Sequence, residues 1–219
     1  MRWPDPEVNR ANQMNEFQQQ VIASIEDSIA AKQRLLENHE TIVALARVSE
    51  LTIDAMREGK KVIFFGNGGS AADAQHLAAE FVGRFAFDRP ALPALALSVN
   101  TSCVTAIGND YGFEFVFARQ LEALGRAGDV AIGVSTSGNS PNIVRGLAVA
   151  KDLGLHTVAL TGCSGGKLKD TVDYCLCAPS NETPRIQECH ILIGHILAQI
   201  VEQTIFHEQS CISGSRRSH

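Results

Sequence analysis

The sequence has no concentration of positive charge. Its 219 residues include 19 lysines and arginines and 24 aspartates and glutamates, so the formal net charge is -5. Proteins that bind nucleic acid through the phosphate backbone carry a basic patch or stripe, whereas here the basic residues are scattered. The composition argues against nucleic-acid binding, and a phosphate site in this chain would have to use backbone amides and hydroxyl groups.

Long apolar runs are also missing. No stretch reaches the roughly 18 consecutive apolar residues that a membrane span needs, and residues 1–16 are polar, with Asp5 and Glu7 where a signal peptide would be apolar. We therefore expect a soluble cytoplasmic protein that contacts no membrane.

The cysteine spacing excludes two further classes. The six cysteines match neither a secreted disulfide framework nor paired Cys-x-x-Cys metal ligands. They are predicted to be reduced thiols in the core, because free cysteine is among the most buried side chains. They are Cys103, Cys163, Cys175, Cys177, Cys189 and Cys211.

The apolar residues that are present predict one α/β domain. Residues 16–58 lack glycine and proline and repeat apolar residues at helical spacing, as in Val21, Ile25 and Ile29, which predicts two amphipathic helices. Short, continuously apolar runs then alternate with helix-like stretches, which is typical of a parallel sheet covered by helices on both faces. The predicted strands are 62–65, 95–97, 130–134 and 157–160, and the predicted helices 71–84, 113–124, 142–153 and 183–206. Residues 1–15 are predicted to be a flexible extension, 16–208 the single domain, and 209–219 a disordered tail.

A glycine-rich loop, Gly66-Asn67-Gly68-Gly69-Ser70, follows the first predicted strand. Ser70 is placed to cap the next helix and Asp73 to complete a capping-box-like pair. The loop has neither the Gly-Lys-Ser/Thr ending of a Walker loop nor the Gly-x-Gly-x-x-Gly dinucleotide spacing. It is a weak signal by itself.

A second polar loop, residues 135–141, follows the strand 130–134. Ser140 suits a helix N-cap and Pro141 the first helical position. Backbone amides, the helix dipole and the hydroxyl groups together would bind a phosphate without lysine. The alternative is a serine-rich turn that only caps its helix.

Acid-base and metal candidates lie on two helices. His76 and Glu80 are four residues apart, so they share one helix face, although such a pair is more often an ordinary surface contact. The helix 183–206 carries Gln187, Glu188, His190 and His195 within an apolar segment, where polar groups need partners. Spacing does not choose between His190 and His195.

From about residue 30 to 206 the chain resembles the bacterial sedoheptulose-7-phosphate (phosphoheptose) isomerases, a branch of the sugar isomerase (SIS) superfamily. The motifs that carry this resemblance are residues 66–76, Glu80, Gly108-Asn109-Asp110, residues 135–140, Arg185-Ile186-Gln187-Glu188 and His195. One departure is Pro184, where some relatives carry an acidic residue.

The resemblance implies a flavodoxin-like parallel sheet and a homotetramer with active sites where subunits meet. It implies His76, Glu80, Gln187 and His195 as ligands of one zinc ion per subunit, and Glu80 and His195 as the acid-base pair, which favours His195 over His190. The substrate contacts that it implies are Asn67, Gly68, Gly69, Ser70, His76, Glu80, Asn109, Asp110, Gln187 and a phosphate cradle of Ser135, Thr136, Ser137 and Ser140.

The implied reaction interconverts sedoheptulose 7-phosphate and D-glycero-D-manno-heptose 7-phosphate, a lipopolysaccharide precursor, through an enediol. Two alternatives share the fold: a non-catalytic sugar-phosphate-sensing protein and a replication-initiator-associating protein. The joint presence of His76, Glu80, Gln187 and His195 argues against the first alternative, and the full glycine loop together with His195 argues against the second.

Overall fold

The computed structural model describes residues 10–214, and its side chains are described for residues 14–206. Two helices come first, α1 (Arg10–Glu37) and α2 (His39–Arg57), and a long helix, α7 (Thr183–Gly214), comes last. These helices reach into both terminal segments of the predicted domain division, and the rest of those segments lies outside the described residues. The division at residues 15 and 208 stays a prediction.

Five parallel strands form one sheet in the order β2-β1-β3-β4-β5. This is the flavodoxin-like order, so the predicted fold class is confirmed. β1 and β3 are buried along their whole length because helices cover both faces, as their unbroken apolar sequence indicates. The strands are β1 (Val62–Gly66), β2 (Ala94–Ala96), β3 (Val130–Ser135), β4 (His156–Thr161) and β5 (Tyr174–Cys177).

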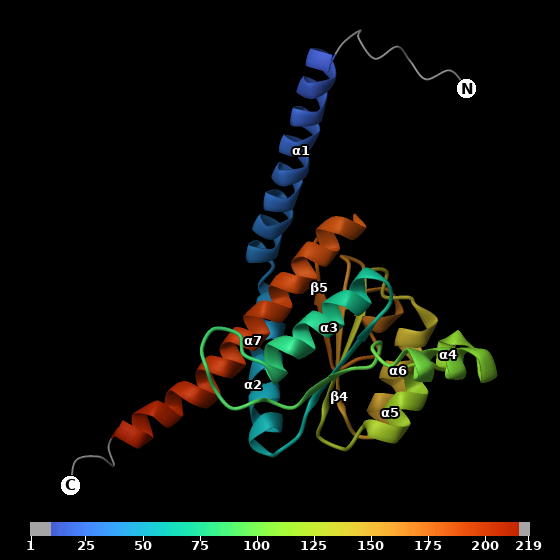
Figure 1. Ribbon diagram of the computed structural model, residues 1–219, viewed down its shortest axis with the longest axis vertical. Helices are drawn as coiled ribbons and strands as arrows, with labels where there is room; N and C mark the ends of the chain where they lie inside the picture. The colour runs from blue at the N-terminus through green and yellow to red at the C-terminus, as the bar shows by residue number, and fades with distance from the viewer. Residues whose placement is uncertain (1–9, 215–219) are drawn as a thin grey trace.

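Alternate residues of each strand enter two separate cores. In β1, Val62 and Phe64 pack with α2, α7 and α3 (Gly69–Val82), whereas Ile63 and Phe65 pack with α5 (Ala118–Leu124) and α6 (Pro141–Asp152). Figure 1 shows α2, α3 and α7 on one side of the sheet and α4 to α6 on the other. The face that carries α3 and α7 is therefore the one that brings His76 and Glu80 toward His195.

The helix α1 extends away from the body of the domain (Figure 1). Its C-terminal half is joined to the start of α7: Ser28 Oγ donates a hydrogen bond to Glu188 Oε2 at 2.6 Å, Lys32 Nζ lies 3.6 Å from the same oxygen, and Arg185 donates to the backbone carbonyl of Ser24. These polar contacts fix α1 to the helix that carries His195.

The segment Thr183–Phe206 of α7 is long and apolar enough to cross a membrane by length and composition alone. In the fold it packs against α1, α2 and α3, and Ile186, Ile193, Leu197 and Val201 are buried in the core. Burial of this face accounts for part of the apolar sequence of α7.

One helix prediction needs correction, and one helix was missed. The segment 113–124 is a short 3-10 turn, η1 (Phe113–Phe115), followed by α5, and α4 (Thr101–Asp110) was not predicted. No residue of α4 is fully buried, and only its half-buried Val104 and Ile107 pack against the core.

The cysteine prediction holds only in part. The five cysteines with described side chains are free. Of these only Cys189 is buried; Cys103, Cys175 and Cys177 are half-buried and Cys163 is exposed. Cys211 lies outside the described side chains.

Candidate active site

The glycine loop and the serine-rich loop lie side by side. They follow β1 and β3, which are neighbours in the sheet, so both emerge at its carboxyl edge. The side-chain amides of Asn67 and Asn142 join them: each amide nitrogen donates to the other carbonyl oxygen, at 2.9 and 2.8 Å. Asn142 is buried, and sequence analysis missed it because its partner is 75 residues away.

Next to this amide pair lies a pocket of about 350 Å³. It is lined by Asn67, Phe113, Glu114, Ser140, Pro141 and Asn142. A somewhat larger pocket, between α2 and the β5 edge, includes none of the predicted site residues. The pocket at the carboxyl edge is lined by two of the predicted substrate contacts, Asn67 and Ser140.

The glycine loop turns sharply into α3. Gly68 has a φ of +55° and is the N-cap, and the helix begins at Gly69. The prediction that Ser70 caps this helix is wrong, because glycine in the left-handed region makes the turn two residues earlier. Ser70 is instead buried in the first turn.

The serine-rich loop leaves a helix N-terminus without a side-chain cap. Ser140 is the N-cap and Pro141 the first residue of α6, as predicted, yet Ser140 Oγ lies 3.1 Å from Ser135 Oγ and makes no capping bond. Thr136 is half-buried and Ser137 is exposed. The Ser135 and Ser140 hydroxyl groups therefore lie together at the N-terminus of α6, an arrangement suited to an anion.

The loop that follows β4 supports the serine-rich loop through backbone contacts. Gly138 has a φ of +64°, and a Cβ there would overlap the carbonyl oxygen of Gly165. The amide of Gly162 donates to Thr136 O at 2.9 Å, and the amide of Lys167 to Asn139 Oδ1 at 3.0 Å. The shape of the serine-rich loop thus depends on glycine at 138.

We expect Gly138→Ala to raise KM for a phosphorylated substrate by about tenfold or more. The added methyl group is strained at this φ and would displace the loop. Steady-state kinetics would measure the change. Gly59→Ala is the matched control, because Gly59 also has a positive φ, +72°, but a Cβ there meets nothing within 4 Å. Equal KM values in the two variants would contradict an anion-binding role for the loop.

His76 and Glu80 on α3 meet His195 on α7. His76 Nε2 lies 2.9 Å from Glu80 Oε1 and 3.4 Å from His195 Nε2, and one ligand atom from each residue lies within 4.8 Å of the others. The two imidazole rings meet edge to face with centroids 5.0 Å apart. The i,i+4 pair on α3 is therefore more than a surface contact, because a third donor from α7 joins it.

This donor set fits a zinc ion. Two nitrogens and a carboxylate oxygen are typical zinc ligands, and ligands of a tetrahedral ion bound at about 2.0–2.1 Å lie about 3.3 Å apart. The separations of 2.9 and 3.4 Å are close to that value. The carboxyl group of Asp73 lies near His76. Burial raises the pKa of Asp73, and the charge of His76 partly offsets the increase.

The structure distinguishes the two histidines that spacing left open. His190 is fully buried, and its Nε2 lies 3.0 Å from the carbonyl oxygen of Thr161. Burial lowers the pKa of His190 to about 4, with the Thr161 hydrogen bond opposing the shift. His190 is therefore a neutral core residue, and His195 is the histidine that joins His76 and Glu80.

Three further predicted residues, which belong to neither loop, also lie outside this cluster. The amide of Gln187 lies against the backbone of Gly69, at the N-terminal end of α3. Asn109 and Asp110 are exposed at the end of α4, where Asn109 Nδ2 donates to Asp110 Oδ1 at 2.8 Å. Within one protomer, then, His76, Glu80 and His195 come together, Gln187 lies by the glycine loop, and Asn109 and Asp110 lie apart.

Comparison with known proteins identifies the family. Residues 25–162 match the SIS domain family. A phosphoheptose isomerase from Sulfurimonas denitrificans is 56% identical over 182 residues, which cover 83% of this chain and 93% of the relative. The chain belongs to the phosphoheptose isomerase branch of the SIS domain family. Another phosphoheptose isomerase of this branch, from Aneurinibacillus thermoaerophilus, is 51% identical, covering 88% of this chain and 96% of the relative.

Solved structures of phosphoheptose isomerases have the same fold. GmhA from Neisseria gonorrhoeae is 43% identical with a TM-score of 0.80, covering 85% of this chain and 99% of that one. The NanR protein of Vibrio vulnificus, solved with ManNAc-6P, is 15% identical with a TM-score of 0.62 and shares the fold only. Both loops, His76 and Glu80 lie within the part of the chain that matches the SIS domain family.

Proposed function

We propose that this chain is an aldose-ketose isomerase that converts sedoheptulose 7-phosphate into D-glycero-D-manno-heptose 7-phosphate. The observation that carries the proposal is the meeting of His76, Glu80 and His195 in a chain 56% identical to a phosphoheptose isomerase. The sensing and replication-initiator alternatives are not favoured, since neither needs this cluster of acid-base groups.

Glu80 and His195 carry the proton transfers. One removes the proton from C1 of the ketose, and the other transfers protons to and from the oxygens on C1 and C2, so that an enediol forms. A proton returned to C2 then gives the aldose. Glu80 Oε1 faces His76 Nε2, which leaves Oε2 as the oxygen that could take the proton from carbon. The serine-rich loop holds the phosphate and so fixes C1 and C2 relative to these groups.

We propose zinc as the cofactor, one ion per subunit. His76, Glu80 and His195 would hold it, with Gln187 as the fourth predicted ligand. When bound, zinc would act as a Lewis acid that polarises the carbonyl and hydroxyl oxygens of the substrate. The donor atoms and their separations support this choice.

A direct assay tests the reaction. Purified protein incubated with sedoheptulose 7-phosphate should yield an aldose 7-phosphate, detected by ¹H NMR, and in D₂O the product should carry deuterium at C2. Solvent exchange is expected because the acid-base groups Glu80 and His195 are only half-buried. Absence of product would refute the proposed function, and product without any deuterium would refute the enediol route.

We also propose that the chain acts as a cytoplasmic homotetramer whose active sites lie between subunits. His76 is exposed in one protomer, and the predicted substrate contacts Asn109 and Asp110 lie apart from the cluster, so a neighbouring subunit could complete the site. The projecting α1 also exposes an apolar face suited to self-association. This face, the α1 face below, consists of Met14, Phe17, Val21, Ile22, Ile25 and Ile29.

The double substitution Val21→Glu, Ile25→Glu is expected to dissociate the tetramer. Burying two carboxylates in an apolar contact without partners is unfavourable. The control is Gln20→Glu, Ala23→Glu, which puts the same charges on the other side of the exposed helix. Light scattering coupled to size exclusion would measure the mass. A tetramer for both variants, or a smaller species for both, would contradict association through the α1 face.

A further inference from the structure

A buried ion pair lies between the two helices that carry the acid-base groups. Arg89, in the loop after α3, donates from Nε to Glu202 Oε1 on α7 at 2.9 Å. The side chains are only 2% and 0% exposed. Replacing such a pair with apolar residues is often neutral for stability, so stability alone is a weak reason for keeping it.

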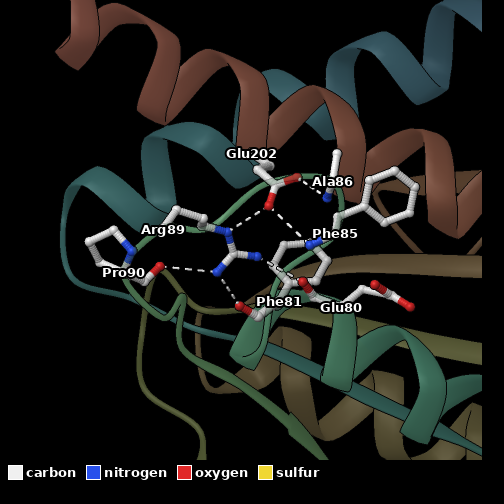
Figure 2. Close-up of polar contacts among 7 residues, drawn as sticks. All are labelled: Glu80, Phe81, Phe85, Ala86, Arg89, Pro90 and Glu202. Carbon is white, nitrogen blue, oxygen red and sulfur yellow. Dashed lines mark hydrogen bonds and ion pairs between the residues drawn. The ribbon is translucent and has the colours of Figure 1, made fainter.

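Glu202 fixes the backbone of the same loop. Its carboxylate accepts hydrogen bonds from the amides of Phe85 at 3.0 Å and Ala86 at 2.7 Å (Figure 2). Burial acts to raise the pKa of Glu202, but the two amides and the Arg89 guanidinium lower it below its usual range. The ring of Phe85 packs on the imidazole of His195, with centroids 5.6 Å apart. Glu202 thereby holds the ring that lies against His195.

Arg89 fixes the end of α3. Its Nη2 donates to the carbonyl oxygen of Glu80 at 2.7 Å, and its Nη1 donates to those of Phe81 at 2.7 Å and Pro90 at 3.0 Å. The last carbonyls of a helix lack partners within the helix, and here a guanidinium supplies them. Figure 2 shows the Glu80 side chain pointing away from Arg89, so Arg89 acts on Glu80 through the backbone alone.

We propose that Arg89 and Glu202 are a positioning pair that sets the placement of Glu80 on α3 relative to His195 on α7. The pair touches neither the acid-base side chains nor the pocket. It acts on Glu80 through the Glu80 carbonyl and on His195 through Phe85. The proposal rests on the proposed function, in which these two residues move the protons and hold the metal.

Arg89→Lys is the first test. Lysine keeps the positive charge that faces Glu202. Its ammonium group cannot donate at the same time to all the acceptors that the planar guanidinium reaches. We expect kcat per folded protomer to fall about 10- to 100-fold with KM within about twofold, because small misplacements of reacting groups have effects of this size. Zinc affinity, measured by competition with a chelating indicator, should weaken by about tenfold, as is typical when the support of metal ligands is removed.

The matched control is Arg47→Lys, at an exposed ion pair on α2 with Glu50, 2.8 Å apart. Arg47→Lys should change neither kcat per folded protomer nor zinc affinity. Phe85→Leu is a second variant that keeps the ion pair and both backbone amides but removes the ring from His195; it should lower kcat about tenfold while circular dichroism and the melting temperature stay near wild type.

A role in stability alone would lower the melting temperature of Arg89→Lys and leave kcat per folded protomer and zinc affinity unchanged; that result would overturn the proposal. If Arg89→Lys does not fold, wild-type kcat and zinc affinity in Phe85→Leu would overturn it. Wild-type protein without isomerase activity would refute the proposed function, and the zinc measurements would still decide whether the pair positions His76, Glu80 and His195.

Discussion

Glu80→Gln is expected to reduce kcat by about 10²- to 10⁴-fold with little change in KM. Glutamine keeps the size of the side chain but cannot accept a proton, and removing a positioned acid-base group has an effect of this magnitude. His195→Ala should cause a loss at least as large, because it removes an acid-base group and a metal donor together. Stopped assays that follow aldose formation would measure both.

The controls for these substitutions are Glu50→Gln and His39→Ala, both at exposed positions on α2 away from the site. Each should have wild-type kcat. The mass in solution should be unchanged in all four variants, since Glu80 and His195 lie outside the α1 face. Turnover within about threefold of wild type in Glu80→Gln or His195→Ala would reject the roles assigned to them.

If zinc is bound as proposed, its removal is expected to lower kcat by about 10²-fold or more. The substrate oxygens would then lack the Lewis acid that the ion would supply. Protein dialysed against a chelator, with metal content measured by elemental analysis, should regain activity with one equivalent of Zn²⁺ per subunit. Mg²⁺ should not restore it, because Mg²⁺ prefers six oxygen ligands to histidine nitrogens.

His76→Ala is the companion experiment to chelation. It removes one donor and should abolish zinc binding, whereas His190→Ala, at a histidine buried away from the cluster, should keep it. Full activity in protein shown to be free of metal would refute a catalytic ion. Zinc binding equal in both variants would place the ion elsewhere.

Most of the fold was predictable because its signals are local. β1 and β3 are continuously apolar since they are buried on both sides, and the helices that cover them have clear apolar faces. The signal failed where burial did not decide the structure. α4 has no buried residue, and Ser70 was taken for a cap because its residue type is favourable, although Gly68 makes the turn.

The sequence named the three side chains that meet at the proposed site, and it gave no sign of what supports them. His76 and Glu80 share a helix face, which spacing shows directly, but only the fold brings His195 to them from 119 residues away. Arg89 and Glu202 were missed for a similar reason. A charged residue in an apolar helix signals that a partner exists, and nothing in the sequence says which residue it is.

The contacts of α1 with Glu188 and Arg185 have a consequence for regulation. They join the proposed association surface to the first turns of α7, close to Gln187 and on the same helix as His195. If assembly changes the affinity of this region for substrate, thermodynamic linkage requires that substrate tighten assembly by the same factor. Dilution of the protein would then make the response to substrate cooperative, without any separate effector site.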